Sequence, residues 1–364
     1  MRTRLKLAAL LAIVVAMASA PVAAPAVAPV LVGPSFASIG PLAFGPGGVL
    51  YAADRQAATI FALDLGMLSA GPTPGTVAVR AVNEKIAALL GTAPAEITIT
   101  DLAVHPTSHN SFLAIMRGQG AGAQAGLLRI DGAGKIDLLS LDAVRFTSVA
   151  LPNPAAVTSA RGGRTQSVTD LAFSNGRLFV AGLSNEEFAS KLWSVAYPFT
   201  SADRGTSVEI FHGNHGQLET RSPVMAFLPL SIDSQPHLIG GYTCTPLVKF
   251  PVAALKPGEK VVGTTIAELG AGNQPLDMIA YQKDGRQFLL MSNSARGVMK
   301  IPTAGFAAAS AITAPVPNGT AGVAFETIAS MTGIEQLDTL DAARAVVIAR
   351  TQAGVRNLAA VALP

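Results

Sequence analysis

The stretch VTDLAFSNGRLFVAGL (168–183) contains two apolar strands joined by the tight turn SNGR (174–177). Asn-Gly between two apolar runs is typical of a β-hairpin. The arrangement recurs in IGPLAFGPGGVLYAAD (39–54), ITDLAVHPTSHNSFLAIM (99–116), SPVMAFLPLSIDSQPHLIGGY (222–242), LDMIAYQKDGRQFLLMSN (276–293) and IEQLDTLDAARAVVIART (334–351). The copies follow one another at spacings of 53 to 69 residues. A strand repeat of that length, without long helices, predicts the radial sheets of a β-propeller.

The repeat predicts an all-β fold, a six-bladed β-propeller of four-stranded antiparallel blades. The first blade has a candidate outer strand near 76–80, and a short helix is expected at 81–90. The sixth repeat ends one strand short, so we expect the N-terminal strand 30–38 to complete the last blade and close the ring, which removes exposed strand edges. The alternative is seven blades, with a divergent blade hidden in the segment 145–166.

The N-terminus has the layout of a secretory signal peptide, with a cationic start, an apolar stretch and small residues. The expected division is a signal peptide at 1–18, a flexible linker at 19–29 and a single β-propeller domain at 30–364. The apolar run of the signal is too short to span a membrane comfortably, and no second one of 18 residues follows. We therefore expect a periplasmic or secreted protein with no stable membrane span after signal cleavage.

Charge and cysteine content narrow the classes of partner. The chain has 26 Lys and Arg against 23 Asp and Glu, and removal of Arg2, Arg4 and Lys6 with the signal leaves 23 of each. Without net positive charge, the electrostatic attraction that dominates nucleic-acid binding is missing. The single cysteine, Cys244, excludes an intrachain disulfide.

In a propeller, the loops that lead into the first strand of each blade share one face with the loops that follow the second strand. Most of the chemically capable residues of this chain lie in those loops, and such a gathering of polar groups is what a binding face requires. The expected ligand-binding face comprises His212, His215, Glu219, Arg296, Asn293, Arg117 and Glu186. Asp54 and Arg55 also follow a second strand.

The fourth blade carries the chemistry of a transition-metal site. Its entering loop, FHGNHGQLETR (211–221), holds His212 and His215, and its second strand ends in GYTCT (241–245) with Cys244. Imidazole and thiolate are the ligands that zinc and copper prefer. The competing interpretation is a buried apolar cysteine beside a solvated turn.

Recurrent aspartates form a second candidate site. Asp101, Asp170 and Asp277 lie at or next to the start of three first strands, and Asn293 lies on the same face. Oxygen ligands that converge at a channel mouth suit calcium. The alternative is that each aspartate caps the turn into its own strand.

The repeated pattern (I/V)-x-D-L-A-(F/V), followed by G-x-L-(Y/F)-V-A, resembles the six-bladed β-propeller superfamily that includes NHL-repeat and gluconolactonase-like proteins. The resemblance covers almost the whole mature chain and implies the fold. For lactonase-like members it also implies a divalent ion at the channel mouth, at positions that Asp170, Asp277 and Asn293 match. The first blade has Gly40 and Pro41 where that group places an acidic ligand.

Three functions remain open. The leading one is an exported non-catalytic propeller that binds a partner protein or small ligand at its channel mouth. The second is a metal-dependent, calcium-type hydrolase that resembles lactonases. The third is a periplasmic copper, zinc or redox protein that uses His212, His215 and Cys244. The implied cofactor is one divalent metal, calcium, copper or zinc, and no catalytic residue is assigned.

Overall fold

The first two strands of each blade form hairpins, and their turns match the sequence. We analysed a computed structural model, which describes residues 33–364 except 67–75, 159–162, 245 and 318. Both residues of the Asn175-Gly176 turn and of the Asp284-Gly285 turn have positive φ, between 49° and 75°. This is the geometry of the type I′ turn, whose twist matches that of the strands it joins.

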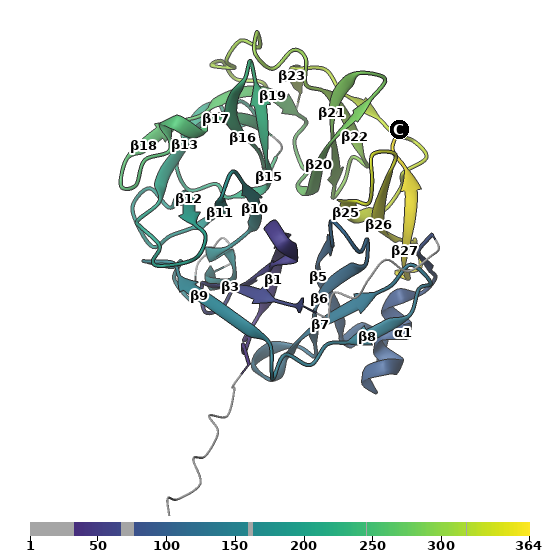
Figure 1. The fold of residues 1–364 in the computed structure, drawn as a ribbon. Coiled ribbons are helices and arrows are strands. Elements are labelled where there is room, and N and C mark those ends of the chain that lie inside the picture. Colours follow the sequence, from purple (N-terminus) through teal and green to yellow (C-terminus); the bar gives the residue numbers. More distant parts are fainter. Residues whose placement is uncertain (1–32, 67–75, 159–162, 245, 318) are drawn as a thin grey trace, which may run out of the picture. The chain divides into compact units, whose positions relative to one another are not determined.

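The strands of the unit 33–364 form six antiparallel sheets in a ring, a six-bladed β-propeller (Figure 1). Blade 1 contains β1 (Ile39–Phe44), β2 (Leu50–Asp54), β3 (Thr59–Asp64) and β9 (Arg145–Ala150). Blade 2 contains β5 (Ile97–Val104), β6 (Ser111–Arg117), β7 (Gln124–Ile130) and β8 (Ile136–Leu138). Blade 3 contains β10 (Asp170–Ser174), β11 (Arg177–Leu183), β12 (Ser190–Ala196) and β13 (Thr206–His212), with β14 (Gln217–Glu219) and β18 (Lys260–Val262) beyond β13.

The other three blades follow the same plan. Blade 4 contains β15 (Val224–Ile232), β16 (Gln235–Tyr242), β17 (Pro246–Pro251) and β19 (Thr264–Leu269), with β23 (Thr320–Gly322) at its edge. Blade 5 contains β20 (Pro275–Lys283), β21 (Arg286–Asn293), β22 (Met299–Pro302) and β24 (Glu326–Thr327). Blade 6 contains β25 (Ile334–Thr339), β26 (Arg344–Arg350), β27 (Arg356–Ala362) and β4 (Ala78–Val79).

The predicted closure of the ring by 30–38 is wrong. The outer strand of blade 6 is β4, where Val79 pairs with Leu358 and Ala78 with Ala359. Residues 33–38 form no strand and lead into β1, where the amides of Ala37 and Ser38 donate to Asp54. The predicted region 76–80 is therefore a strand, but it belongs to the last blade and not to the first.

The alternative of a seventh blade in 145–166 is also wrong. Within that segment, β9 pairs with β3 along its whole length and is the outer strand of blade 1. After β3 the chain thus leaves blade 1 and contributes β4 to blade 6. It then forms blade 2 and returns to blade 1, where β9 is the outer strand. The expected helix is present as α1 (Val82–Leu90), and its buried Val82 and Ile86 join the core between blades 2 and 6.

The blades do not follow chain order around the ring. The inner strands contact one another in the sequence β1, β5, β25, β20, β15, β10 and back to β1, as the colours in Figure 1 show. Blade 2 therefore lies between blades 1 and 6, because the crossings of β4 and β9 enclose it. The apolar core lies between blades; one cluster, for example, joins Phe179 of blade 3 to Phe227 and Tyr242 of blade 4.

No helix in the described part of the chain has the length and hydropathy of a membrane span. The expected signal peptide and linker lie outside the described residues.

Candidate metal centre

Two histidines and the only cysteine meet where blades 3 and 4 adjoin. His212 ends β13, His215 lies in the turn between β13 and β14, and Cys244 follows β16. One ring nitrogen of each histidine and the Cys244 Sγ all lie within 4.8 Å of one another. The structure thus brings together the three residues that the sequence predicts as copper or zinc ligands.

Glu219 holds both imidazole rings. Its Oε2 lies 2.9 Å from His212 Nδ1 and its Oε1 lies 2.5 Å from His215 Nδ1, while the Ser222 hydroxyl donates to Oε2. Burial raises the pKa of Glu219, but hydrogen bonds with His212, Ser222 and His215 outweigh it and hold that pKa well below its ordinary value. An ionised glutamate therefore fixes the orientation of both rings, which lie 3.9 Å apart between centroids.

The remaining ring nitrogens are free to meet a ligand. Because Glu219 occupies the Nδ1 atoms, Nε2 is left on each ring. The His212 side chain is 1% exposed, and its Nε2 is buried with no hydrogen-bond partner in the described part of the chain. An unsatisfied buried nitrogen costs free energy. A carboxylate on one nitrogen and an open position on the other is the usual arrangement of a metal-binding histidine.

The backbone around Cys244 is held in an unusual conformation. Cys244 has φ 61°, in the left-handed region that non-glycine residues rarely adopt. Its amide donates to Asn273 O at 2.7 Å, and its carbonyl accepts from Asn214 Nδ2 at 3.1 Å. These two bonds keep the half-buried thiol on the side of the histidines, and strain of this kind is concentrated at functional sites.

Glu268 holds the turn between His212 and His215 in place by hydrogen bonds. It is fully buried in β19, and its carboxylate accepts from Gly213 N at 2.5 Å and from Asn214 Nδ2 at 2.9 Å. Burial raises the pKa of Glu268. Glu268 and Asn214 were not predicted from the sequence; the one local signal of Glu268 is a charged residue inside the apolar strand TTIAEL (264–269).

The three ligand atoms fit a zinc or copper ion. Bonds of about 2.0 Å to nitrogen and 2.3 Å to sulfur place tetrahedral ligand atoms roughly 3.3 to 3.8 Å apart. Starting from separations within 4.8 Å, ligand movements of the order of 1 Å complete the coordination. Two imidazoles and a thiolate suit zinc and copper and do not suit calcium or magnesium, which prefer oxygen.

The recurrent aspartates connect neighbouring blades. Four aspartates share three features: a half-buried side chain, a hydrogen bond from the next amide of their own strand, and a hydrogen bond from an amide of the adjacent blade. The inter-blade bonds run from Leu42 N to Asp101, from Val104 N to Asp338, from Leu337 N to Asp277 and from Phe227 N to Asp170, at 2.6 to 2.8 Å. Burial raises the pKa of all four. We call these four residues the aspartate latches.

The aspartate latches cap the turns into their own strands, as one interpretation of the sequence predicted, and they also bond to the neighbouring blade. Met278 N donates to Asp277 Oδ1 at 2.8 Å and Leu171 N to Asp170 Oδ1 at 2.7 Å, so each does cap its own strand. Irregular pairing beside Asp101 and Asp277 interrupts the inner strands, as β-bulges that re-aim side chains do. Asn293 accepts a hydrogen bond from Asn273, which lies before β20, and donates to Met291 O and Gly297 O. The calcium-type site stays a prediction, and Asp338 is a latch that was not predicted from the sequence.

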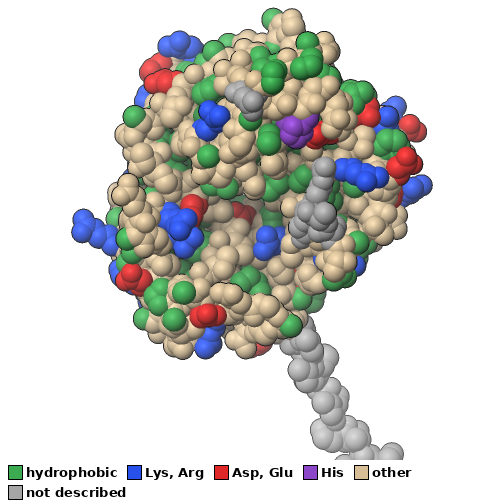
Figure 2. Space-filling view, turned by 180° about the vertical axis from the view of Figure 1, so that it is seen from behind, with side chains coloured by type: hydrophobic (Ala, Val, Ile, Leu, Met, Phe, Trp, Pro, Cys, Tyr) green, Lys and Arg blue, Asp and Glu red, His purple; other side chains and the backbone are tan. Residues whose placement is uncertain are grey.

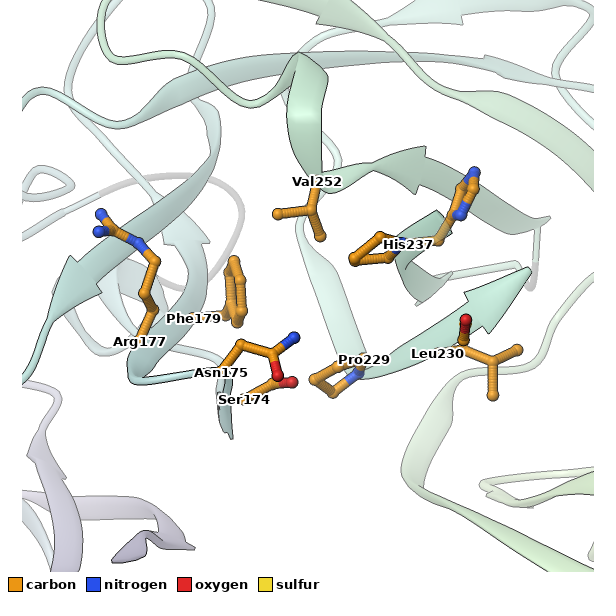
Figure 3. A pocket seen from close by; sticks show the side chains of 10 residues that line it. Ser174, Asn175, Arg177, Phe179, Pro229, Leu230, His237 and Val252 are labelled. Carbon is orange, nitrogen blue, oxygen red and sulfur yellow. The ribbon is translucent and has the colours of Figure 1, made fainter. Parts of the chain in front are cut away.

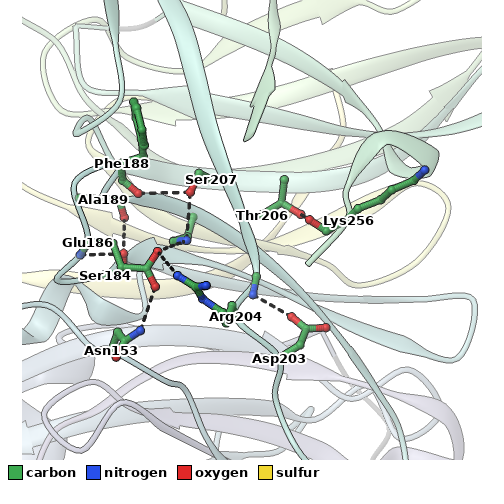
Figure 4. Close-up of polar contacts among 12 residues, drawn as sticks. Asn153, Ser184, Glu186, Phe188, Ala189, Asp203, Arg204, Thr206, Ser207 and Lys256 are labelled. Carbon is green, nitrogen blue, oxygen red and sulfur yellow. Dashed lines mark hydrogen bonds and ion pairs between the residues drawn. The ribbon is translucent and has the colours of Figure 1, made fainter. Parts of the chain in front are cut away.

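Other residues of the predicted ligand face have structural partners. Glu186 accepts from the buried Lys191 Nζ at 2.8 Å and from Asn153 Nδ2 at 2.9 Å, within the network of Figure 4. Arg296 Nη2 donates to Ala271 O at 3.0 Å. Arg117 ends β6 and is half-buried.

A cavity of about 400 Å³ lies near the start of β16, where His237 is one of its lining residues (Figure 3). Cys244 follows the other end of that strand, so His237 and the metal centre lie at opposite ends of blade 4. Figure 2 shows one face of the molecule, hollowed at its centre, with a histidine (purple) beside an acidic side chain (red) above the hollow.

Comparisons with known proteins identify no family for this chain. No protein-family model matches the sequence, and no curated protein matches it. Among solved structures, the PQQ-bound aldose sugar dehydrogenase of Streptomyces coelicolor is 12% identical, with 91% of this chain and 95% of that chain covered and a TM-score of 0.31. The apo aldose sugar dehydrogenase of Escherichia coli is 11% identical, with 91% and 97% covered and a TM-score of 0.35.

A chain of the mitotic checkpoint complex is similar to the same extent, 11% identical with 97% and 100% covered and a TM-score of 0.38. No specific family is shown, and these likenesses carry no argument about activity.

Proposed function

We propose that this protein is an exported β-propeller that binds one zinc or copper ion through His212, His215 and Cys244. The observation that carries the proposal is the convergence of these three side chains, together with a buried His212 Nε2 that has no hydrogen-bond partner among the described residues. The Glu219 carboxylate orients both imidazoles, so little ordering remains to be paid when the ion binds.

A metal titration with paired histidine variants tests the proposal. The chelator-treated protein should take up one equivalent of zinc or cuprous ion. His215→Ala should weaken that binding at least about 100-fold by removing one of three ligands, because His215 is 45% exposed and its loss leaves the core intact. The control, His237→Ala, removes a half-buried histidine at the other end of blade 4 and should leave the metal affinity unchanged.

Cys244 supplies a second readout that needs no variant. Since it is the only cysteine of the chain, the rate of thiol alkylation reports this site alone. Bound metal should slow alkylation strongly. Unchanged alkylation at saturating metal, or equal metal affinity of the wild type and His215→Ala, would rule out the proposed ligand set.

Export is part of the same proposal and rests on residues 1–18. Cleavage after Ala18 satisfies the preference for small residues at the cleavage site, together with Ala16. The mass of the protein recovered from a bacterial periplasm or culture medium should therefore correspond to a chain that begins at Ser19. Recovery of the uncleaved chain in the membrane fraction would contradict it.

A further inference from the structure

Another cleft lies away from the metal centre. A cleft of about 690 Å³ opens between blades 1 and 2, and Arg55, Thr98, Thr100 and Gln119 are among its lining residues. Arg55 follows β2, and the two threonines lie in β5. The cleft therefore shares no residue with the site at blades 3 and 4.

The Arg55 guanidinium is enclosed but has no direct partner. Its Nε is buried without a hydrogen bond, and among the described residues its side chain forms no ion pair and no hydrogen bond. The stem lies flat on Gly40, where a Cβ would come within 2.5 Å of Arg55 Cγ and Cδ. Glycine at position 40 thus makes room for Arg55 at the place where an acidic residue was expected by resemblance.

The two nearby carboxylates are engaged elsewhere. Asp54 accepts four backbone amides, those of Ala37, Ser38, Gln56 and Ala57, at 2.6 to 3.2 Å. Asp101 accepts Leu42 N at 2.6 Å, and burial raises its pKa well above the ordinary value, which reduces the negative charge beside Arg55. Burial in turn lowers the pKa of Arg55, with Asp101 and Asp54 opposing that effect.

A second polar atom in the cleft also has no partner. Thr100 Oγ1 is buried and makes no hydrogen bond with any residue that the structure describes. A guanidinium fork with hydroxyl and amide groups around it matches the oxygens of a carboxylate or phosphate. We propose that this cleft binds a small polar molecule through an oxyanion group, carboxylate or phosphate, held by Arg55 with Thr100 beside it.

Calorimetric titration at constant ionic strength tests the site with two probes, inorganic phosphate and tartrate. At least one should bind the wild-type protein with a stoichiometry of one. Arg55→Met keeps the stem on Gly40 and removes the charge, and it should weaken that binding at least about 10-fold. The matched control is Arg296→Met, since Arg296 likewise lies on a glycine, Gly270, but is exposed and bonded to Ala271 O; its affinity should change less than about two-fold.

The outcomes separate the sources of the oxyanion. Binding of tartrate alone identifies a carboxylate ligand, and binding of phosphate alone identifies a phosphate ligand. Failure of both probes, or equal affinity of Arg55→Met and the wild type, overturns the proposal.

Chemical labelling keeps the test independent of how well the variant folds. The probe that binds should protect Arg55 of the wild-type protein from phenylglyoxal at least about five-fold by peptide mass spectrometry, and should leave Arg296 unprotected. Equal labelling of Arg55 with and without the probe would also overturn the proposal. These experiments can be done with metal-free protein, so their failure would not count against the proposed metal centre.

Discussion

At the scale of single residues, the candidate centre depends on one carboxylate that orients two imidazoles. Spacing in the sequence was enough to place His212, His215 and Cys244 on one face, because each lies at or just after a strand end whose face the repeat specifies; their role as metal ligands stays a prediction. Glu268 could not be predicted as a support, because its role arises from a strand of blade 4 that passes under a turn contributed by blade 3. No local spacing encodes that contact.

Replacement of Glu219 by glutamine tests its role as a positioning residue. The amide has one acceptor oxygen and no charge, so it cannot hold both Nδ1 atoms as the carboxylate does. We expect zinc affinity to fall about 10- to 100-fold, with a stoichiometry still of one. The control is Glu187→Gln, an exposed glutamate of the β11–β12 loop. Equal affinity of both variants would show that Glu219 does not position the ligands.

At the scale of elements, strand positions were predicted well and strand partners less well. Most strands of the hairpins lie within a few residues of their expected ranges, because alternation and turn residues are local signals. The outer strands β4 and β9 pair with blades that are distant in sequence, and β4 contains two residues. A pairing that short leaves no periodicity from which a partner can be predicted.

Two adjacent residues of β4 allow a matched test of ring closure. Val79 is 2% exposed and packs in the core between blades 2 and 6, whereas Ala78 is exposed. Val79→Asp buries an unpaired charge and should lower the free energy of unfolding by about 3 kcal/mol or more. Ala78→Asp should lower it by less than about 1 kcal/mol. Denaturant titration measures the free energy of unfolding of both variants. Equal losses would show that Val79 is not buried in the core between blades 2 and 6.

At the scale of the whole molecule, the order of the blades and the aspartate latches determine how the ring holds together. The sequence predicted six blades and could not predict their order, because the crossings of β4 and β9 decide it. Asp338 of blade 6 bonds Val104 of blade 2, a contact that exists only because blade 2 lies beside blade 6. The repetition of aspartates in the sequence thus reflects repeated contacts between blades.

The latch at Asp338 predicts a dependence of stability on pH. Burial raises the pKa of Asp338 to about 6, so the folded protein binds this proton more tightly than the unfolded chain does. The resulting stabilisation is fully present below about pH 4 and is lost as the pH rises through 6. Asparagine has one acceptor oxygen in place of two, so Asp338→Asn also loses a hydrogen bond from a backbone amide. We therefore expect Asp338→Asn to lower the free energy of unfolding at pH 4 and to lower it less at pH 8. The two losses should differ by about 1 to 3 kcal/mol.

Denaturant titrations at both pH values measure this difference, with Asp142→Asn, an exposed acid, as the control. A loss for Asp338→Asn that is the same at both pH values, or larger at pH 8, would show that the latch is not protonated in the folded state.

X-ray absorption spectroscopy of the zinc- or copper-loaded protein identifies the atoms that bind the metal. We expect one sulfur at about 2.3 Å and two imidazole nitrogens at about 2.0 Å, with the sulfur signal absent in Cys244→Ser. A wild-type spectrum with oxygen and nitrogen ligands alone would show that Cys244 does not bind the metal.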